Sequence, residues 1–284
     1  MKTIDDYDLE IKQNPNDAEL YRLRGVEYVN KKDYDRAIVD YDQAIKLNPN
    51  CAKAYNSRGY AYREKNEFDR AIDDFNRSIQ LDPNLSYPYL NRGVAYYRMD
   101  NEKNACEDFT KAIELDPNDH EAYINRGIVF NSSGFFCFMQ NKTDLGKQFI
   151  GHAIKDFTQA IIINPNCAVG YWGLGSAYEN IKNYDKAIDK YEKALQLDPN
   201  DFETYQCLGG TYRKMKNYDK ALDNYEKALQ LNPNYFCAYN QRGFMYNEMG
   251  EYEKAIVDWE ASIKINPDDD NIKKMIEITK TEVK

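Results

Sequence analysis

The regular spacing of the prolines constrains this chain more than any other feature. Apart from Pro88, prolines recur every 34 residues, except that Pro117 and Pro165 are 48 residues apart. A fixed period of this length is typical of repeat architectures, in which each short unit packs on its neighbours. The chain therefore contains seven repeats, and the fourth is longer than the others by 14 residues. The repeats occupy residues 18–51, 52–85, 86–119, 120–167, 168–201, 202–235 and 236–269.

The same residue types return at the same slots when each repeat is counted from its first residue. Slot 4 is tyrosine and slot 8 is glycine in all seven repeats; slots 11 and 24 are aromatic, slot 20 is alanine, and slot 27 is alanine or serine. Slots 4, 8 and 11 share one face of a first helix, and slots 20, 24 and 27 share one face of a second. Because a glycine inside a helix costs about 1 kcal/mol relative to alanine, we expect slot 8 to mark a close contact between helices.

These slots, together with the closing proline, resemble the tetratricopeptide repeat over essentially the full length of the chain. The resemblance implies an all-α fold, a right-handed superhelical solenoid of antiparallel helix pairs whose first helices line a concave groove. It also implies a non-catalytic scaffold that binds a protein or peptide. The terminal units of a solenoid need a polar outer face to remain soluble. We therefore expect residues 1–17 to form an N-terminal capping half-repeat and residues 270–284 a C-terminal capping helix.

Composition and motifs disfavour other classes of function. The net charge of −9 argues against a nucleic-acid partner, which requires a concentrated basic surface. No segment is long and apolar enough for a membrane span, and the first residues lack the apolar stretch of a signal peptide, so we expect a cytoplasmic location. Six cysteines without a C-x-x-C pair and two histidines provide no zinc-ligand spacing. No phosphate-binding loop or nucleophile motif is present either, and we expect no cofactor, no metal and no enzymatic activity.

Two slots change together along the chain. Slot 7, which is leucine in the family's usual pattern, is arginine in five repeats, and each of these repeats has aspartate at slot 23. The two repeats with Leu174 and Leu208 at slot 7 carry Lys190 and Asn224 at slot 23 instead. We therefore predict an arginine–aspartate pair between the two helices of one repeat, in preference to a row of free arginines that would bind an anion.

Several aromatic and amide side chains are not needed for the expected core. Slots 4, 11, 17 and 24 account for the core rings, whereas slots 2, 5, 6, 9, 12 and 13 face the groove in this family, where their formal charges sum to zero. Exposed rings on a concave surface are frequent anchors of binding energy, and amides can hold a peptide backbone. The alternative for each ring is packing between neighbouring first helices. The predicted partner-binding residues of the groove are Tyr60, Tyr87, Asn91, Tyr97, Asn125, Trp172 and Phe244.

The groove lacks the residues that bind chaperone tails. Some tetratricopeptide domains hold the terminal carboxylate of such tails with lysine, arginine and asparagine at groove slots. At the corresponding slots, the first three repeats carry Arg22 with Val26, then Ser57, then Tyr87 with Asn91. We therefore predict that a chaperone C-terminal tail is not the ligand.

The insertion in the fourth repeat is a second candidate contact. Fourteen residues correspond to about four helical turns, so we expect each helix to gain seven residues, with a turn near residues 141–144. An irregular loop is the alternative, which Gly134, Gly146 and Gly151 would permit. In either conformation an apolar cluster projects from the array, and a partner or a second copy of the chain could cover it. A self-associating module that forms a homodimer through the insertion or the solenoid ends is therefore the alternative function. The predicted contact residues are Phe135, Phe136, Phe138 and Met139.

Overall fold

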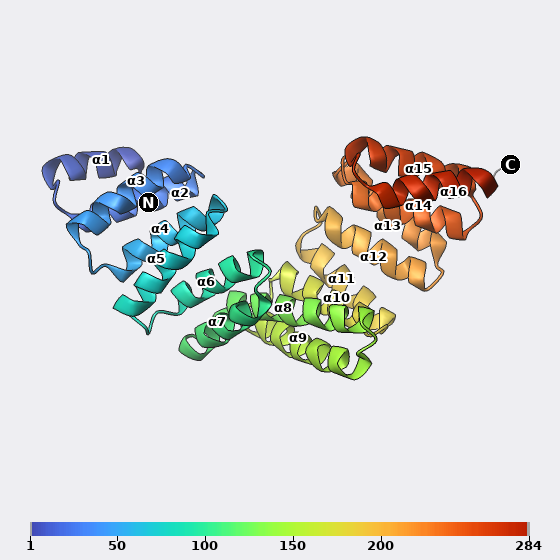
Figure 1. Ribbon diagram of the computed structural model, residues 1–284, viewed down its shortest axis with the longest axis horizontal. Coiled ribbons are helices and arrows are strands. Elements are labelled where there is room, and N and C mark those ends of the chain that lie inside the picture. Colours follow the sequence, from blue (N-terminus) through green and yellow to red (C-terminus); the bar gives the residue numbers. More distant parts are fainter. Residues whose placement is uncertain (1, 283–284) are drawn as a thin grey trace. The chain divides into compact units, whose positions relative to one another are not determined.

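A computed structural model describes residues 2–282, so residues 1 and 283–284, at the outer ends of the two predicted caps, lie outside the described part. The described residues form sixteen α-helices and no strand, and successive helices pack as antiparallel pairs (Figure 1). The first helices of the pairs are α2 (Ala18–Asn30), α4 (Ala52–Glu64), α6 (Ser86–Arg98), α8 (His120–Met139), α10 (Ala168–Asn180), α12 (Phe202–Lys214) and α14 (Phe236–Glu248). The second helices are α3 (Tyr34–Leu47), α5 (Phe68–Leu81), α7 (Glu102–Leu115), α9 (Thr143–Ile163), α11 (Tyr184–Leu197), α13 (Tyr218–Leu231) and α15 (Tyr252–Ile265). The all-α solenoid of helix pairs is confirmed.

The chain divides into two compact units, one ending at Val129 and the other beginning at Phe130, within α8. In the first unit, α1 (Ile4–Gln13) covers the first pair, because Tyr7 and Ile11 are buried with Leu20. In the second unit, α16 (Asp270–Glu282) covers the last pair in the same way. Each unit thus has a helix over its terminal repeat.

Tight turns join the two helices of each pair. The middle residue of the turn lies in the left-handed region, with φ from 57 to 61° at six non-glycine residues and 77° at Gly250. The next residue often caps the second helix, as Asp33 does by accepting a hydrogen bond from the backbone of Arg36. The second helix ends before the closing proline, since the residue ahead of proline avoids helical geometry: Asn48, which precedes Pro49, has φ −135° and ψ 89°.

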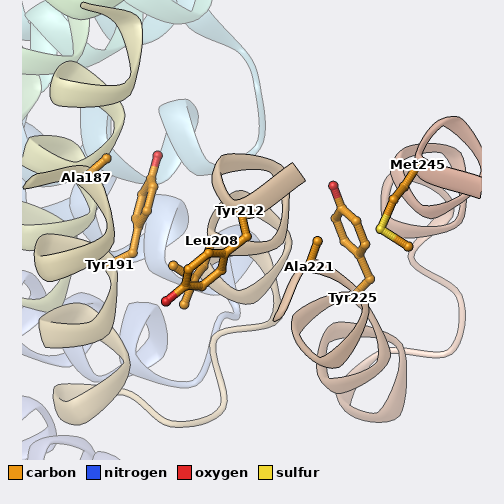
Figure 2. Packing of buried hydrophobic residues seen from close by; sticks show 7 residues of the cluster. All are labelled: Ala187, Tyr191, Leu208, Tyr212, Ala221, Tyr225 and Met245. Carbon is orange, nitrogen blue, oxygen red and sulfur yellow. The ribbon is translucent and has the colours of Figure 1, made fainter. Parts of the chain in front are cut away.

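The glycine column brings the two helices of a pair together. A Cβ atom at Gly25 would lie 2.6 Å from the ring of Tyr41, and one at Gly209 would lie 2.8 Å from the ring of Tyr225. All seven slot-24 rings are at most 1% exposed. Figure 2 shows this packing in the second unit, where Tyr225 lies between Ala221 and Met245. The close contact that the glycines predict is therefore confirmed.

The other aromatic slots are less buried than the sequence analysis expects. The slot-4 tyrosines are half-buried in every repeat, because their hydroxyl ends reach the turn before the helix. The hydroxyl of Tyr21, for example, donates a hydrogen bond to the carbonyl of Pro15 at 3.1 Å. The guanidinium of Arg24 lies 5.7 Å from the centre of the same ring. These rings therefore line the edge of the core. In the five repeats that have arginine at slot 7, its guanidinium lies 5.6 to 5.9 Å from the centre of the ring.

The predicted arginine–aspartate pairs are present in four repeats. In each, the arginine Nε donates to one carboxylate oxygen at 2.8 Å and Nη2 donates to the other at 2.5 to 2.7 Å. The aspartates are only 3 to 6% exposed. The fifth predicted pair, Arg126 with Asp156, stays a prediction. The four pairs are Arg24–Asp40, Arg58–Asp74, Arg92–Asp108 and Arg242–Asp258.

The four slot-7 arginines of the first unit also bind the preceding helix pair or the cap, a contact that the sequence did not predict. In each, Nη1 donates to a side-chain oxygen on the preceding second helix, or on α1 for Arg24, at 2.5 to 3.1 Å. Each acceptor lies 16 residues before its arginine, and the residue at that position is polar in all four cases. Each arginine thus fastens its own helix pair to the previous one. The acceptors are Asp8, Asp42, Asn76 and Thr110.

The insertion is a lengthened hairpin. Helix α8 has 20 residues and α9 has 21, whereas the other first and second helices have 13 and 14. The turn is centred on Asn141, with φ 59°, and α9 begins at Thr143. A Cβ atom on Gly134 or on Gly146 would lie 3.1 Å from the carbonyl oxygen of the other, so the added turns pack closely. The expected hairpin is confirmed, and the irregular loop is not formed.

Candidate functional site

The predicted groove residues lie on the side of the first helices that carries slots 2, 5, 6, 9, 12 and 13, here called the first-helix face. All seven are half-buried, in contrast to the fully buried slot-24 rings. The face is described separately for each unit, because the two units are independent compact bodies.

Side chains of repeats 2 and 3 form a polar chain on the face of the first unit. The guanidinium of Arg63 lies 4.5 Å from the centre of the Tyr60 ring, and its Nη1 donates to Oδ1 of Asn91 at 2.8 Å. The Asn91 amide then donates to Oδ1 of Asn56 at 3.1 Å. The structure thus brings Tyr60 and Asn91 together through Arg63. A ligand that used Asn91 would compete with these bonds or extend them.

The remaining predicted residues of the first unit differ in how much they are engaged. The Tyr87 hydroxyl is buried without a hydrogen-bond partner among the described atoms, and burial raises the pKa of Tyr87. Tyr97 packs against the core cluster that contains Phe109. The amide of Asn125 donates to the carbonyl of Glu121 in its own helix at 2.8 Å, which leaves its oxygen for other contacts.

The two predicted rings of the second unit pack against other helices. Trp172 packs against the cluster that contains Tyr191 and Leu208, and its indole N–H is buried. Burial in the same region raises the pKa of the Cys207 thiol to about 12. Phe244 lies edge-on to Trp259, with 5.4 Å between ring centroids. Trp172 therefore packs against the next first helix, which was the stated alternative, whereas Phe244 packs on the second helix of its own repeat.

Charges on the face of the second unit are largely paired with one another. Lys214 donates to Glu179 at 2.6 Å, and Arg213 donates to Glu248 at 3.2 Å. Each of these pairs joins slot 12 of one repeat to slot 13 of the next, 35 residues later. Glu179 also accepts a hydrogen bond from the hydroxyl of Tyr191 at 2.8 Å. The sequence shows that the formal charges at these slots sum to zero, but their pairing is visible only in the structure.

The insertion exposes an apolar tip. Phe135, Phe136 and Met139 are 52, 61 and 69% exposed, and Leu145, which the sequence analysis missed, is 43% exposed. Phe138 is half-buried, because its ring packs where a Cβ atom of Gly146 would be. Three of the four predicted residues are therefore free to contact a partner, and the fourth supports the hairpin.

Other kinds of site are not evident in the described region. Within residues 2–282, no group of three or more histidine, cysteine, aspartate or glutamate side chains is arranged to hold a metal ion. No helix in that range is both long and apolar enough to cross a membrane.

Comparison with known families agrees with this architecture. Models described as tetratricopeptide repeat match residues 18–51, 40–73, 86–119, 168–201, 202–235 and 236–269, and a model described as TPR repeat matches residues 59–100. The chain belongs to the tetratricopeptide repeat family, whose members are in general non-catalytic protein-interaction scaffolds. These matches leave out residues 120–167, the repeat with the insertion. A search of curated proteins finds no match.

Solved structures share the fold at low sequence identity. A chain of the crystal structure of the APC/C hetero-tetramer Cut9–Hcn1 is 19% identical with a TM-score of 0.74, and the match covers 97% of this chain but 52% of that one. A tetratricopeptide repeat protein from Parabacteroides merdae is 18% identical with a TM-score of 0.69, over 93% of this chain and 98% of that one. MamA is 30% identical with a TM-score of 0.51, and the match covers 64% of this chain and 92% of MamA. This chain thus spans about half the length of the Cut9–Hcn1 chain.

Proposed function

We propose that this scaffold binds an extended or helical segment of another protein on its first-helix face, with the tip of the fourth repeat as a second contact. The observation that carries the proposal is that all seven predicted groove residues are half-exposed, although rings at slot 24 are completely buried. Half-exposed aromatic side chains provide apolar anchors, and the amide oxygen of Asn125 can accept a hydrogen bond from a peptide backbone.

Selection from a library of phage-displayed dodecapeptides tests the face directly. The selected peptides would be synthesised with a fluorophore and an amidated C-terminus, and their binding measured by fluorescence anisotropy. Tyr60→Ala should weaken binding to the first unit by about 2 kcal/mol if the ring is an anchor. Val39→Ala is the matched control, because Val39 is 66% exposed on a second helix. Peptides that bind both variants equally, together with an unchanged affinity for Trp172→Ala, would refute binding at this face.

The same peptides address the chaperone-tail prediction. We expect a free terminal carboxylate to bind no better than an amide, because the first three repeats lack the residues that hold it. A large gain with the free carboxylate would contradict this expectation.

Self-association through the tip is a second candidate function, favoured by the exposed apolar side chains Phe135, Phe136, Met139 and Leu145. Sedimentation velocity at micromolar concentration should then show a dimer that Phe136→Asp dissociates. Val257→Asp is the control, because Val257 is 65% exposed on α15 and lies outside the tip. A wild-type chain that sediments as a monomer leaves the tip as a contact for a different protein.

A deletion designed from the structure separates the tip from the rest of the array. Removing residues 133–139 and 143–149 takes seven residues from each helix and keeps the turn residue Asn141 at the position with positive φ. This variant should retain its helicity and its affinity for peptides selected on the first-helix face. Loss of that affinity would show that the tip shapes the face.

A further inference from the structure

Arg98 stands out among the charged residues of the first unit. It lies in the last turn of α6 and is exposed, and no carboxylate within residues 2–282 forms an ion pair with it. It borders a hollow of about 250 Å³ that is also lined by Arg63, Glu64, Phe68 and Val94. The hollow is therefore lined by two guanidinium groups, one carboxylate and the amide of Asn66, beside the apolar side chains of Phe68 and Val94.

The neighbouring arginine is already satisfied. Arg63 donates to Glu64 through Nε at 3.2 Å and through Nη2 at 2.7 Å, and to Asn91 through Nη1. Glu64 thereby balances Arg63, and the positive charge of Arg98 remains uncompensated. An anion in the hollow would meet a net charge of one positive unit.

The equivalent slots in the second unit show what is missing here. Slot 12 of one repeat and slot 13 of the next carry Glu179 with Lys214, and Arg213 with Glu248, as closed pairs. In repeats 2 and 3 the same two slots carry Arg63 and Arg98, two like charges. At these two slots, each pair of the second unit contains one acidic residue, whereas repeats 2 and 3 have two arginines and no acidic residue.

The rest of the face in repeats 1 to 3 has the same bias. Arg22 is paired with Glu19, and Arg63 with Glu64. The charges that form no ion pair among the described residues are Lys53 and Arg98, both positive. Complementarity of charge therefore favours an acidic ligand on this part of the face, even though the formal charges of the whole face sum to zero.

We propose that the hollow between repeats 2 and 3 binds an aspartate or glutamate side chain of the partner segment, with Arg98 as its ion-pair partner. The inference rests on the proposed function, since it names the chemistry of the segment that the face takes. Phe68 and Val94 would contact the apolar part of that side chain, and Tyr60 would lie over Arg63 beside it. The acid is an internal side chain rather than a chain terminus, and Glu64 in the same hollow disfavours a doubly charged phosphate.

The test uses the full chain and the amidated, phage-selected peptides described above. Selected sequences should contain aspartate or glutamate at a fixed position. Arg98→Glu should weaken their binding at least about tenfold, whereas Arg77→Glu, which changes an exposed arginine of α5, should change it less than about twofold. Arg98→Gln serves as a milder variant if reversal of charge at the end of α6 lowers the melting temperature.

Reversal of the peptide charge makes the test specific. A peptide in which the selected acid is replaced by lysine should bind Arg98→Glu more tightly than it binds the wild-type chain. Peptides that bind but show no acidic preference, or equal effects of the Arg98 and Arg77 changes, would overturn this inference and leave the proposed function intact. A library that yields no peptide sensitive to Tyr60→Ala or Trp172→Ala would overturn both.

Discussion

The pair formed by Arg92 and Asp108 offers the sharpest test of how the repeats are held together. We consider Arg92→Leu, Asp108→Asn and the double variant. The double variant places in repeat 3 the residues that repeat 6 already has, Leu208 and Asn224, at the same two slots. The fold is therefore known to accommodate both residues together.

The geometry sets the expected magnitudes. Arg92→Leu removes donors at 2.8 and 2.7 Å from a carboxylate that is 6% exposed, and breaking a buried pair in this way costs about 3–5 kcal/mol. Because the aspartate can instead take up a proton, the cost at pH 7 is limited to about 4 kcal/mol. We expect about 3 kcal/mol for Arg92→Leu and about 2 kcal/mol for Asp108→Asn, since the arginine keeps its bond to Asn76 at 2.5 Å. The double variant should cost only about 1 kcal/mol, because no buried charge remains.

Urea unfolding followed by far-ultraviolet circular dichroism measures these values. Both tryptophans, Trp172 and Trp259, lie in the second unit, so their fluorescence follows the unfolding of that unit, whereas circular dichroism follows the whole chain.

The dependence on pH gives a second readout. Burial raises the pKa of Asp108, and Arg92 opposes this shift, so removal of the arginine raises the pKa of the folded state further. A carboxyl group whose pKa is higher in the folded than in the unfolded state destabilises the fold at high pH. The deficit of Arg92→Leu should therefore be complete at pH 7 and shrink as the pH falls through the raised value. That of Asp108→Asn should not shrink, because the wild-type carboxyl also gains stability on protonation and asparagine does not titrate.

Two results would refute this reasoning. One is a double variant whose loss of stability equals the sum of the two single losses. The other is an Arg92→Leu deficit that is the same at pH 7 and at about pH 5.

Four further predictions concern three glycines and one cysteine. Gly209→Ala should destabilise the fold by about 1–3 kcal/mol in urea unfolding, because its methyl group would lie 2.8 Å from the ring of Tyr225. Gly151→Ala, which meets nothing within 4 Å in α9, should instead stabilise by up to about 1 kcal/mol, and equal effects would contradict the packing argument. Gly250→Ala also meets nothing within 4 Å, so its expected cost of about 1 kcal/mol would come from the backbone φ of 77° alone. Cys207 should resist iodoacetamide at pH 8 in the folded chain, as judged by mass spectrometry, because burial raises the pKa of its thiol to about 12.

The helix pairs were predictable because each one reuses the same spacing. Glycine at slot 8 and an aromatic ring at slot 24 have to meet across a pair, and the covariation of slots 7 and 23 identified the arginine–aspartate contact in the same way. Even the lengthened hairpin follows from arithmetic, since seven residues in each helix keep every slot on its face.

The extent of burial on the first-helix face was not predictable. A slot number gives the side of the helix on which a residue lies, but the depth of its side chain depends on residues of neighbouring helices. Trp172 packs inward beside Leu208 of the next repeat, and Phe244 lies edge-on to Trp259 of the second helix of its own repeat. The pairing of charges was also hidden, because it joins residues 35 positions apart through the reach of long side chains.

The hairpin of repeat 4 shows how such an array can gain a new part without disturbing the old ones. Seven helical residues rotate the chain by about 20° less than two full turns. The side chains that follow each added stretch therefore point in nearly the same direction as before. The backbone contact between Gly134 and Gly146 then continues the spacing that the shorter pairs set with glycine and alanine. An insertion of this length can therefore be moved as a unit. The same extension transferred to another repeat would place its apolar tip at a different position along the array, and its removal would leave the packing of the neighbouring repeats unchanged.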